Sequence, residues 1–115
     1  MAVAAMVKRN FRLNHDGIGY RFSEVITDGA TGNDIHIPSL PPGKTPTVVI
    51  RAGAGSGNVE FTMSDDDDVL AGTATWDQYW PLGASTGTVA DTLEGTVTGI
   101  RGVSVSGEIT IEVVI

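Results

Sequence analysis

Apolar and polar residues alternate over several short stretches of this chain, as they do in β-strands that bury one face. The clearest stretch lies near the C-terminus, where apolar side chains occupy every second position of residues 103–105 and again of residues 109–113. Gly107 lies between the two stretches and can adopt the positive φ of a tight turn. The pattern therefore predicts a β-hairpin over residues 103–113.

Two further hairpins are predicted upstream. One pairs residues 47–52 with residues 58–64 across an intervening segment that contains three glycines. The other pairs residues 7–13 with residues 18–26 across Asp16–Gly17, a dipeptide that type I′ turns favour. Both predictions rest on the same combination of β-prone residues and turn residues.

Shorter elements fill the rest of the chain. Strands are expected at residues 35–37, 73–79 and 95–100, and a single helical turn is expected at residues 89–93. Residues 27–46 contain several glycines followed by prolines, which predicts a long excursion between strands. No apolar repeat with the period of a helix lasts for more than two turns, so helices contribute little to the expected fold.

The composition also favours strands. Val, Ile and Thr, whose branched Cβ atoms suit the pleated conformation, make up about 30% of the 115 residues. This length is enough for one domain. We therefore predict an all-β fold, an antiparallel β-sandwich that resembles a jelly roll. Residues 13–115 would form a single domain, and residues 1–12 an extended N-terminal arm.

Several classes of protein are excluded or disfavoured by the residues that are missing. The chain has no Cys, which excludes disulfides, thiolate catalysis and Cys-ligated metal sites. The longest apolar run, Met1–Val7, is far shorter than the ~20 residues that span a bilayer. Lys8 and Arg9 follow this run, whereas in a signal peptide the basic residues precede it.

Charge is distributed unevenly along the chain. The formal net charge is −7, but residues 1–21 carry +3 and residues 52–115 carry −9. A body this acidic repels phosphate backbones, so we expect no nucleic-acid binding through it. The basic N-terminal segment is the candidate site for an anionic partner, although the same asymmetry can simply keep a protein in solution.

Three motifs imitate enzyme or cofactor sites without the required context. Gly43–Thr45 matches the end of a phosphate-binding loop, but Pro46 stands where the following helix should begin. The glycines of residues 53–57 lack the spacing of a dinucleotide fingerprint. Gly83–Gly87 fits G-x-S-x-G, yet both histidines precede Ser85, whereas an α/β-hydrolase places its histidine after the serine. We therefore expect no catalytic residues and no cofactor.

Two candidate metal sites are similarly incomplete. Asp34 and His36 would share one face of a strand, but no third ligand accompanies them. In the acidic run Asp65–Asp68, the loop positions that an EF-hand gives to Gly and Glu are occupied by Leu70 and Trp76. We interpret the run as an acidic turn between strands, with a weak cation site as the alternative, and assign no metal.

Three of the seven aromatic residues lie close together, at Trp76, Tyr79 and Trp80. Strand alternation would place the two tryptophans on one face and Tyr79 on the other. We expect one ring to anchor in the core and the others to form a partly exposed rim. An exposed ring in this position could also contact carbohydrate or protein.

The segment Gly57–Val114 resembles a family of small structural proteins from tailed-bacteriophage virions. The resemblance rests on a strand reading VEFTMS that leads through an acidic turn to an aromatic strand, and on the closing stretch TGIRGVSVSGEITIEV. It covers about half of the chain and contains no catalytic motif. Among such proteins, capsid decoration or cement proteins of this size are the most similar in character.

This resemblance implies a virion protein that is not an enzyme. It would be assembled in the cytoplasm of the host bacterium, bind the major capsid protein lattice on the outer capsid surface, and stabilise the head by bridging subunits. Other copies of the chain would be further partners, forming a homo-oligomer, and neither nucleic acid nor membrane would be bound. A neck, tail or fiber-adaptor role and a small carbohydrate- or host-surface-binding module are the alternatives. The residues expected to bind partners are Met1, Val3, Met6, Val7, Lys8, Arg9, Arg12, Trp76, Tyr79 and Trp80.

Overall fold

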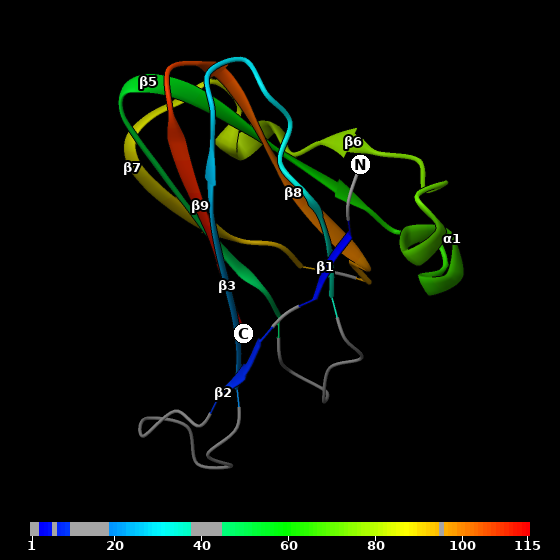
Figure 1. Cartoon of the computed structure of the whole chain (residues 1–115). Helices are drawn as coiled ribbons and strands as arrows, with labels where there is room; N and C mark the ends of the chain where they lie inside the picture. The colour runs from blue at the N-terminus through cyan, green and yellow to red at the C-terminus, as the bar shows by residue number, and fades with distance from the viewer. Residues whose placement is uncertain (1–2, 6, 10–18, 38–44, 95) are drawn as a thin grey trace.

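The computed structural model describes residues 3–5, 7–9, 19–37, 45–94 and 96–115. Within these ranges the chain forms a curled, mostly antiparallel β-sheet with one short α-helix (Figure 1), which confirms the all-β prediction. The elements are β1 (Val3–Ala5), β2 (Val7–Arg9), β3 (Gly19–Ile26), β4 (Asp34–His36), β5 (Thr47–Thr62), α1 (Asp66–Ala71), β6 (Asp77–Gln78), the 3-10 turn η1 (Trp80–Leu82), β7 (Ser85–Thr92), β8 (Gly99–Ser106) and β9 (Ile109–Val114).

The long strand β5 belongs to two layers of the sheet. Its first half, residues 47–51, pairs with β9 on one side and β7 on the other. Its second half, residues 57–62, pairs with β8 and, at its end, with β6. Between the halves, Gly53 has a φ of +56° and the pairing with β7 is irregular. The predicted hairpin over residues 47–64 is therefore wrong, because the glycines bend one strand and do not reverse the chain.

The two layers have the strand order of a jelly roll. One layer runs β3-β9-β5-β7 through the first half of β5, and the other runs β4-β8-β5-β6 through the second half. Each layer thus combines strands that are distant in sequence, as in the two Greek keys of a jelly roll, and only the second half of β5 and β6 follow one another within one layer. The predicted jelly-roll-like sandwich is confirmed, with β5 serving both layers as a single bent strand.

The N-terminal strands β1 and β2 lie at the two ends of the strand order. β1 extends the second layer by pairing in parallel with β4, and β2 extends the first layer by pairing antiparallel with β3. Figure 1 shows β1 and β2 following one another along one side of the molecule. Val7 lies opposite Arg21 and Arg9 opposite Gly19, so the pairing expected between these two segments is confirmed. The expected turn at Asp16–Gly17 lies outside the described residues.

The two C-terminal strands form where they were predicted but do not pair with each other. β8 pairs with β4 and β5, whereas β9 pairs with β3 and β5, so the two strands lie in different layers. The chain crosses between layers at Gly107, whose φ is +74°. The N–H of Gly107 donates a hydrogen bond of 2.8 Å to Asp28 Oδ1. The hairpin over residues 103–113 is therefore wrong, since alternation locates strands but does not choose their partners.

The shorter predicted elements had mixed outcomes. The strand expected at residues 35–37 is confirmed as β4, which is shifted by one residue. The strand expected at 73–79 is reduced to the two residues of β6, and the one expected at 95–100 begins only at Gly99. The helical turn expected at 89–93 is wrong, because those residues end β7, where Val89 lies opposite Ile50.

The hydrophobic core fills the space between the layers. Ile50, Ile111 and Val113 contribute from the first layer, and Val59 and Ile100 from the second. All five side chains are fully buried. Burial of these aliphatic side chains is the main stabilising contribution to the fold, at roughly 25 cal/mol per Å² of apolar surface removed from water. The outer faces of the layers carry polar side chains together with a few exposed apolar ones, such as Val25 and Val105.

Candidate functional site

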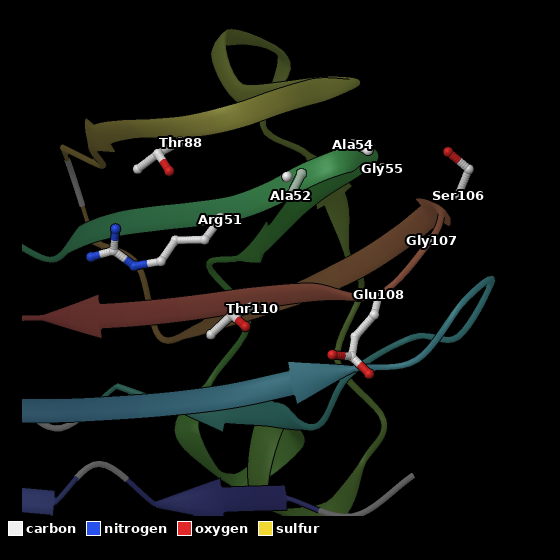
Figure 2. A pocket seen from close by; sticks show the side chains of 10 residues that line it. Arg51, Ala52, Ala54, Gly55, Thr88, Ser106, Gly107, Glu108 and Thr110 are labelled. Atoms are coloured by element: carbon white, nitrogen blue, oxygen red, sulfur yellow. The ribbon is translucent and has the colours of Figure 1, made fainter.

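An open depression of about 660 Å³ lies where β5, β7 and β9 meet the turn between β8 and β9 (Figure 2). We call it the Arg51 depression. Figure 2 shows Arg51 on β5 between Thr88 of β7 and Thr110 of β9, while Glu108 lies toward the turn. The lining residues are Arg51, Ala52, Gly53, Ala54, Gly55, Thr88, Ser106, Gly107, Glu108 and Thr110.

Strand register explains why these side chains share one surface. Thr110, Arg51 and Thr88 lie directly opposite one another on three adjacent strands, so their side chains project to the same outer face. The small residues at the bend of β5 leave room beside Arg51. Gly55 lies so close to the Ser106 carbonyl that a Cβ atom could not be accommodated there. The depression is therefore a product of the bend that also joins the two layers.

Arg51 is held by a carboxylate that it shares with a second arginine. Its Nε donates a hydrogen bond of 2.8 Å to Glu112 Oε1, and Arg21 Nη2 contacts Glu112 Oε2. Both guanidinium groups are about half exposed, whereas Glu112 is buried. The hydrogen bond from Arg51 is the main cause that holds the pKa of Glu112 below its ordinary value; burial opposes this, and the charges of both arginines reinforce it.

We expect this triad to make the stability of the protein depend on acid. Because the pKa of Glu112 is lowered in the folded state, its stabilising contribution is present above the unfolded pKa and is lost as pH falls through the folded pKa. Glu112→Gln should lower the free energy of unfolding by about 1–2 kcal/mol near neutral pH, since the arginines are partly solvated. Its stability should then decline less steeply with acid than that of the wild type.

Urea unfolding at neutral and acidic pH measures this difference. Glu108→Gln is the matched control, because Glu108 is an exposed carboxylate lining the same depression. It should change the free energy of unfolding by less than about 0.5 kcal/mol. Equal acid sensitivity of Glu112→Gln and the wild type would contradict the assigned role of the triad.

The Arg51 depression offers groups that can form hydrogen bonds with a polar partner. Its lining carries one guanidinium, one carboxylate, hydroxyl groups and backbone groups. Arg51 and Arg21 share the carboxylate of Glu112, and Glu108 lies in the same depression, so the positive charges on this outer face are offset by carboxylates. The arrangement suits hydrogen bonding to a polar surface.

The aromatic cluster is divided among three different environments. Trp76 is half-buried, with the Arg101 guanidinium 4.4 Å from its ring centroid. The Tyr79 ring packs edge-on against Phe61 at 6.2 Å, and its hydroxyl donates a hydrogen bond of 2.8 Å to Asp91 Oδ2. Trp80 is 75% exposed. Of the three predicted contact residues, Trp80 presents most of its surface to a partner.

The expected alternation of these rings along a strand is wrong. β6 covers only Asp77–Gln78, and Trp80 is the first residue of η1, followed by Pro81. Tyr79 packs at the edge of the core, which is consistent with an anchor, although none of the three rings is fully buried. Burial first, and then the bond to Asp91, raises the pKa of the Tyr79 hydroxyl.

The acidic run does not form the expected turn. Asp66, Asp67 and Asp68 occupy the first turn of α1, where negative charges interact favourably with the helix dipole. Gly72 ends the helix in the left-handed conformation, at a φ of +77°. In the described residues, no three His, Cys, Asp or Glu side chains lie close enough together to hold a metal ion.

Asp34 and His36 interact with different partners. His36 Nε2 lies 2.8 Å from Asp66 Oδ1, which ties α1 to β4. Asp34 is buried and contacts Arg101 Nη1 at 3.4 Å. Asp34 therefore forms an ion pair with Arg101 and His36 a hydrogen bond with Asp66, and the shared metal face considered from the sequence does not form.

The remaining motif residues are structural or lie outside the described residues. Ser85 is buried, and its hydroxyl donates a hydrogen bond of 2.8 Å to the Leu82 carbonyl, so it is not held by a base. Most of Gly43–Thr45 lies outside the described residues. Of the ten predicted contact residues, Met1, Met6 and Arg12 also lie outside, while the backbone of Val3 belongs to β1 and that of Val7, Lys8 and Arg9 to β2.

Sequence reasoning missed the two ion-pair clusters that organise the outer faces. The partners of Glu112 are separated from it by 91 and 61 positions along the chain. Local patterns contain no signal for such pairs. The ion pairs of Glu112 become evident only once β9 is known to pair with both β3 and β5.

Comparisons with known proteins give little further guidance. Neither a family model nor a curated protein matches the chain. The capsular polysaccharide assembling protein CapF from Staphylococcus aureus is similar in structure over 95% of this chain and 30% of that chain, with 14% sequence identity and a TM-score of 0.43. The chain thus spans less than a third of CapF, and a likeness this weak bears on neither activity nor partners. No helix in the described residues is long and apolar enough to cross a membrane.

Proposed function

We propose that this protein is a structural component of a tailed-phage virion, which binds the major capsid protein lattice and bridges subunits on the outer surface of the head. The observation that carries the proposal is the attachment of the basic N-terminal segment to the sheet. β1 and β2 have three residues each and pair only at the two outer ends of the strand order. The jelly-roll body and the resemblance of residues 57–114 to phage virion proteins support the same interpretation.

Short terminal strands of this kind can exchange between molecules at low cost. Each makes few hydrogen bonds, and β1 pairs in parallel, which is the slightly weaker arrangement. An arm that leaves its own sheet for that of a neighbour recovers the same bonds. Apolar residues Met1, Val3, Met6 and Val7 would add buried surface, while Lys8, Arg9 and Arg12 would meet carboxylates.

Deleting residues 1–12 should leave a folded β-sandwich that attaches poorly to phage heads. The core residues that the structure describes run from Ile26 to Val113, so the circular dichroism of the truncated chain should stay that of a β-protein. Loss of β1 and β2 should lower the thermal midpoint modestly, because β3 and β4 lose their outer partners. Co-sedimentation with heads assembled without this protein measures attachment.

Replacing Lys8, Arg9 and Arg12 by Ala is the matched variant that keeps the arm at full length. At low salt this variant should attach to heads as weakly as the wild type does at high salt, because screening by salt removes the same electrostatic attraction from the wild type. Equal attachment of the truncated and full chains would refute the bridging arm. A particle map with the protein at the neck or tail would favour that alternative location.

The exposed ring of Trp80 supports the neck, tail or carbohydrate-binding alternative. Trp is enriched among the residues that contribute most of the binding energy in protein interfaces. If the arm deletion weakens attachment and Trp80→Ala does not, the result favours the bridging arm over contact through Trp80.

A further inference from the structure

The edges of the sandwich are covered to different extents. β1 covers β4 along its whole length, whereas β2 covers only Gly19–Arg21 of β3, whose remaining edge residues include the charged Glu24. On the opposite side, β7 pairs with β5 and, within the described part of the chain, with no other strand. Figure 1 shows β7 as the outermost strand at this side. An eight-residue edge strand exposes backbone groups that another strand can bind.

The hydrogen-bond pattern identifies which backbone groups face outward. The N–H of Leu93 donates a hydrogen bond of 2.9 Å to the Pro46 carbonyl, so these residues form a hydrogen-bonded pair of the β5–β7 ladder. Such pairs alternate along an antiparallel ladder, so Asp91 and Val89 also direct their backbone groups toward β5. The N–H and C=O groups of the alternate residues, Thr88, Ala90 and Thr92, point away from β5.

Thr92 is already satisfied by side chains of the same molecule. Its N–H donates a hydrogen bond of 2.8 Å to Asp91 Oδ1, and its carbonyl accepts one of 3.3 Å from the Tyr79 hydroxyl. No described residue forms a hydrogen bond with the outward backbone groups of Thr88 and Ala90. The open part of the edge is therefore the segment Thr88–Ala90.

The segment Thr88–Ala90 lacks two of the features by which natural edge strands avoid association, because it contains no charged residue and no proline. The irregular part of the β5–β7 ladder lies outside it, at residues 85–87 of β7. Thr88 and Ala90 are exposed, while Val89 packs against the core. Because the chain as a whole carries −7, an uncharged edge is where two copies can approach with the least repulsion.

We propose that β7 pairs antiparallel with β7 of a second copy, about a two-fold axis at Val89. In this register Thr88 of each copy lies opposite Ala90 of the other, and both residues have outward N–H and C=O groups. The two hydrogen-bonded pairs supply four bonds, so the segment is self-complementary. The first layers of the two sandwiches then form one continuous sheet. This pairing rests on β7 alone and does not depend on the proposed role in a virion.

Ala90→Pro tests the pairing without disturbing the parent sheet. Proline removes the N–H of Ala90, which points outward, and leaves every β5–β7 bond in place. Sedimentation equilibrium of the full chain should show a concentration-dependent dimer for the wild type. In the variant, loss of two of the four bonds should weaken the dimer about tenfold or more. Association of the wild type should strengthen with salt, because like net charges are then screened.

Lysine substitutions provide a second, matched pair of variants. Ala90→Lys and Ser23→Lys add the same charge at exposed positions in one cross-strand row of the outer face, but only Ala90 lies on β7, whereas Ser23 lies on β3 at the other side of the layer. Ala90→Lys should abolish the dimer, and Ser23→Lys should retain it. A wild type that stays monomeric at millimolar concentration would overturn the proposal, as would equal dimerisation of the wild type and Ala90→Pro.

Discussion

Ile111→Ala should lower the free energy of unfolding by about 2–5 kcal/mol, as expected when a fully buried aliphatic side chain is truncated. Ile111 is 0% exposed and lies on β9, between β3 and β5. Its cross-strand neighbours are Glu24 and Ile50, and Gly102 of the opposite layer approaches its side chain closely. A cavity at this position is enclosed by both layers, so the surrounding structure can relax only slightly. Urea unfolding measures the loss.

Val105→Ala is the control for this substitution. Val105 is an aliphatic residue on β8, but it is 51% exposed. Its truncation should cost less than about 0.5 kcal/mol. A loss below about 1 kcal/mol for Ile111→Ala would show that β9 does not hold a central place in the core.

The comparison of Ile111 with Val105 shows what the sequence pattern can predict. Alternation correctly located β8 and β9, and the β-branched composition correctly indicated an all-β sandwich. The pattern could not show that β5 separates the two strands, since alternation specifies which face is buried and says nothing of the neighbouring strand. A turn residue such as Gly107 is equally suited to a hairpin and to a crossing between layers.

The glycines of residues 53–57 were ambiguous for the same physical reason. Positive φ at Gly53 and the close approach of Ser106 to Gly55 are needed for a sharp bend, and the same freedom suits a hairpin loop. The two outcomes differ only in long-range pairing. α1 escaped prediction because its six residues are too few to show a helical period.

The sequence predicted fewer features of the molecular surface than of the fold. Exposure of Trp80 agrees with the expected rim, whereas the outward cluster of Arg21, Arg51 and Glu112 depends on the register of three strands. The open edge of β7 depends on which strands pair with it and on the side-chain bonds that satisfy Thr92. Such features follow from tertiary structure and have no local signature.

Arg101→Ala should lower the free energy of unfolding by about 2–4 kcal/mol, because it leaves a buried carboxylate without its cation. Arg101 Nε donates a hydrogen bond of 2.6 Å to Glu60 Oε1, and Nη1 lies 3.4 Å from Asp34 Oδ1. Asp34 is only 4% exposed. Glu60 is better solvated, which places the expected cost below that of a fully buried pair. The same guanidinium stacks on Trp76, so the variant also loses a cation–π contact.

Two further measurements distinguish electrostatic loss from simple loss of packing. Adding Asp34→Asn to Arg101→Ala removes the unpaired buried charge, so the double variant should be less unstable than the sum of the single variants. Tryptophan fluorescence should change in Arg101→Ala, because Trp76 loses the cation above its ring. Arg51→Ala, at a half-exposed arginine, is the control and should cost about 1 kcal/mol. Strict additivity of Arg101→Ala and Asp34→Asn would show that Arg101 stabilises β8 through its aliphatic stem, and that Asp34 does not depend on it.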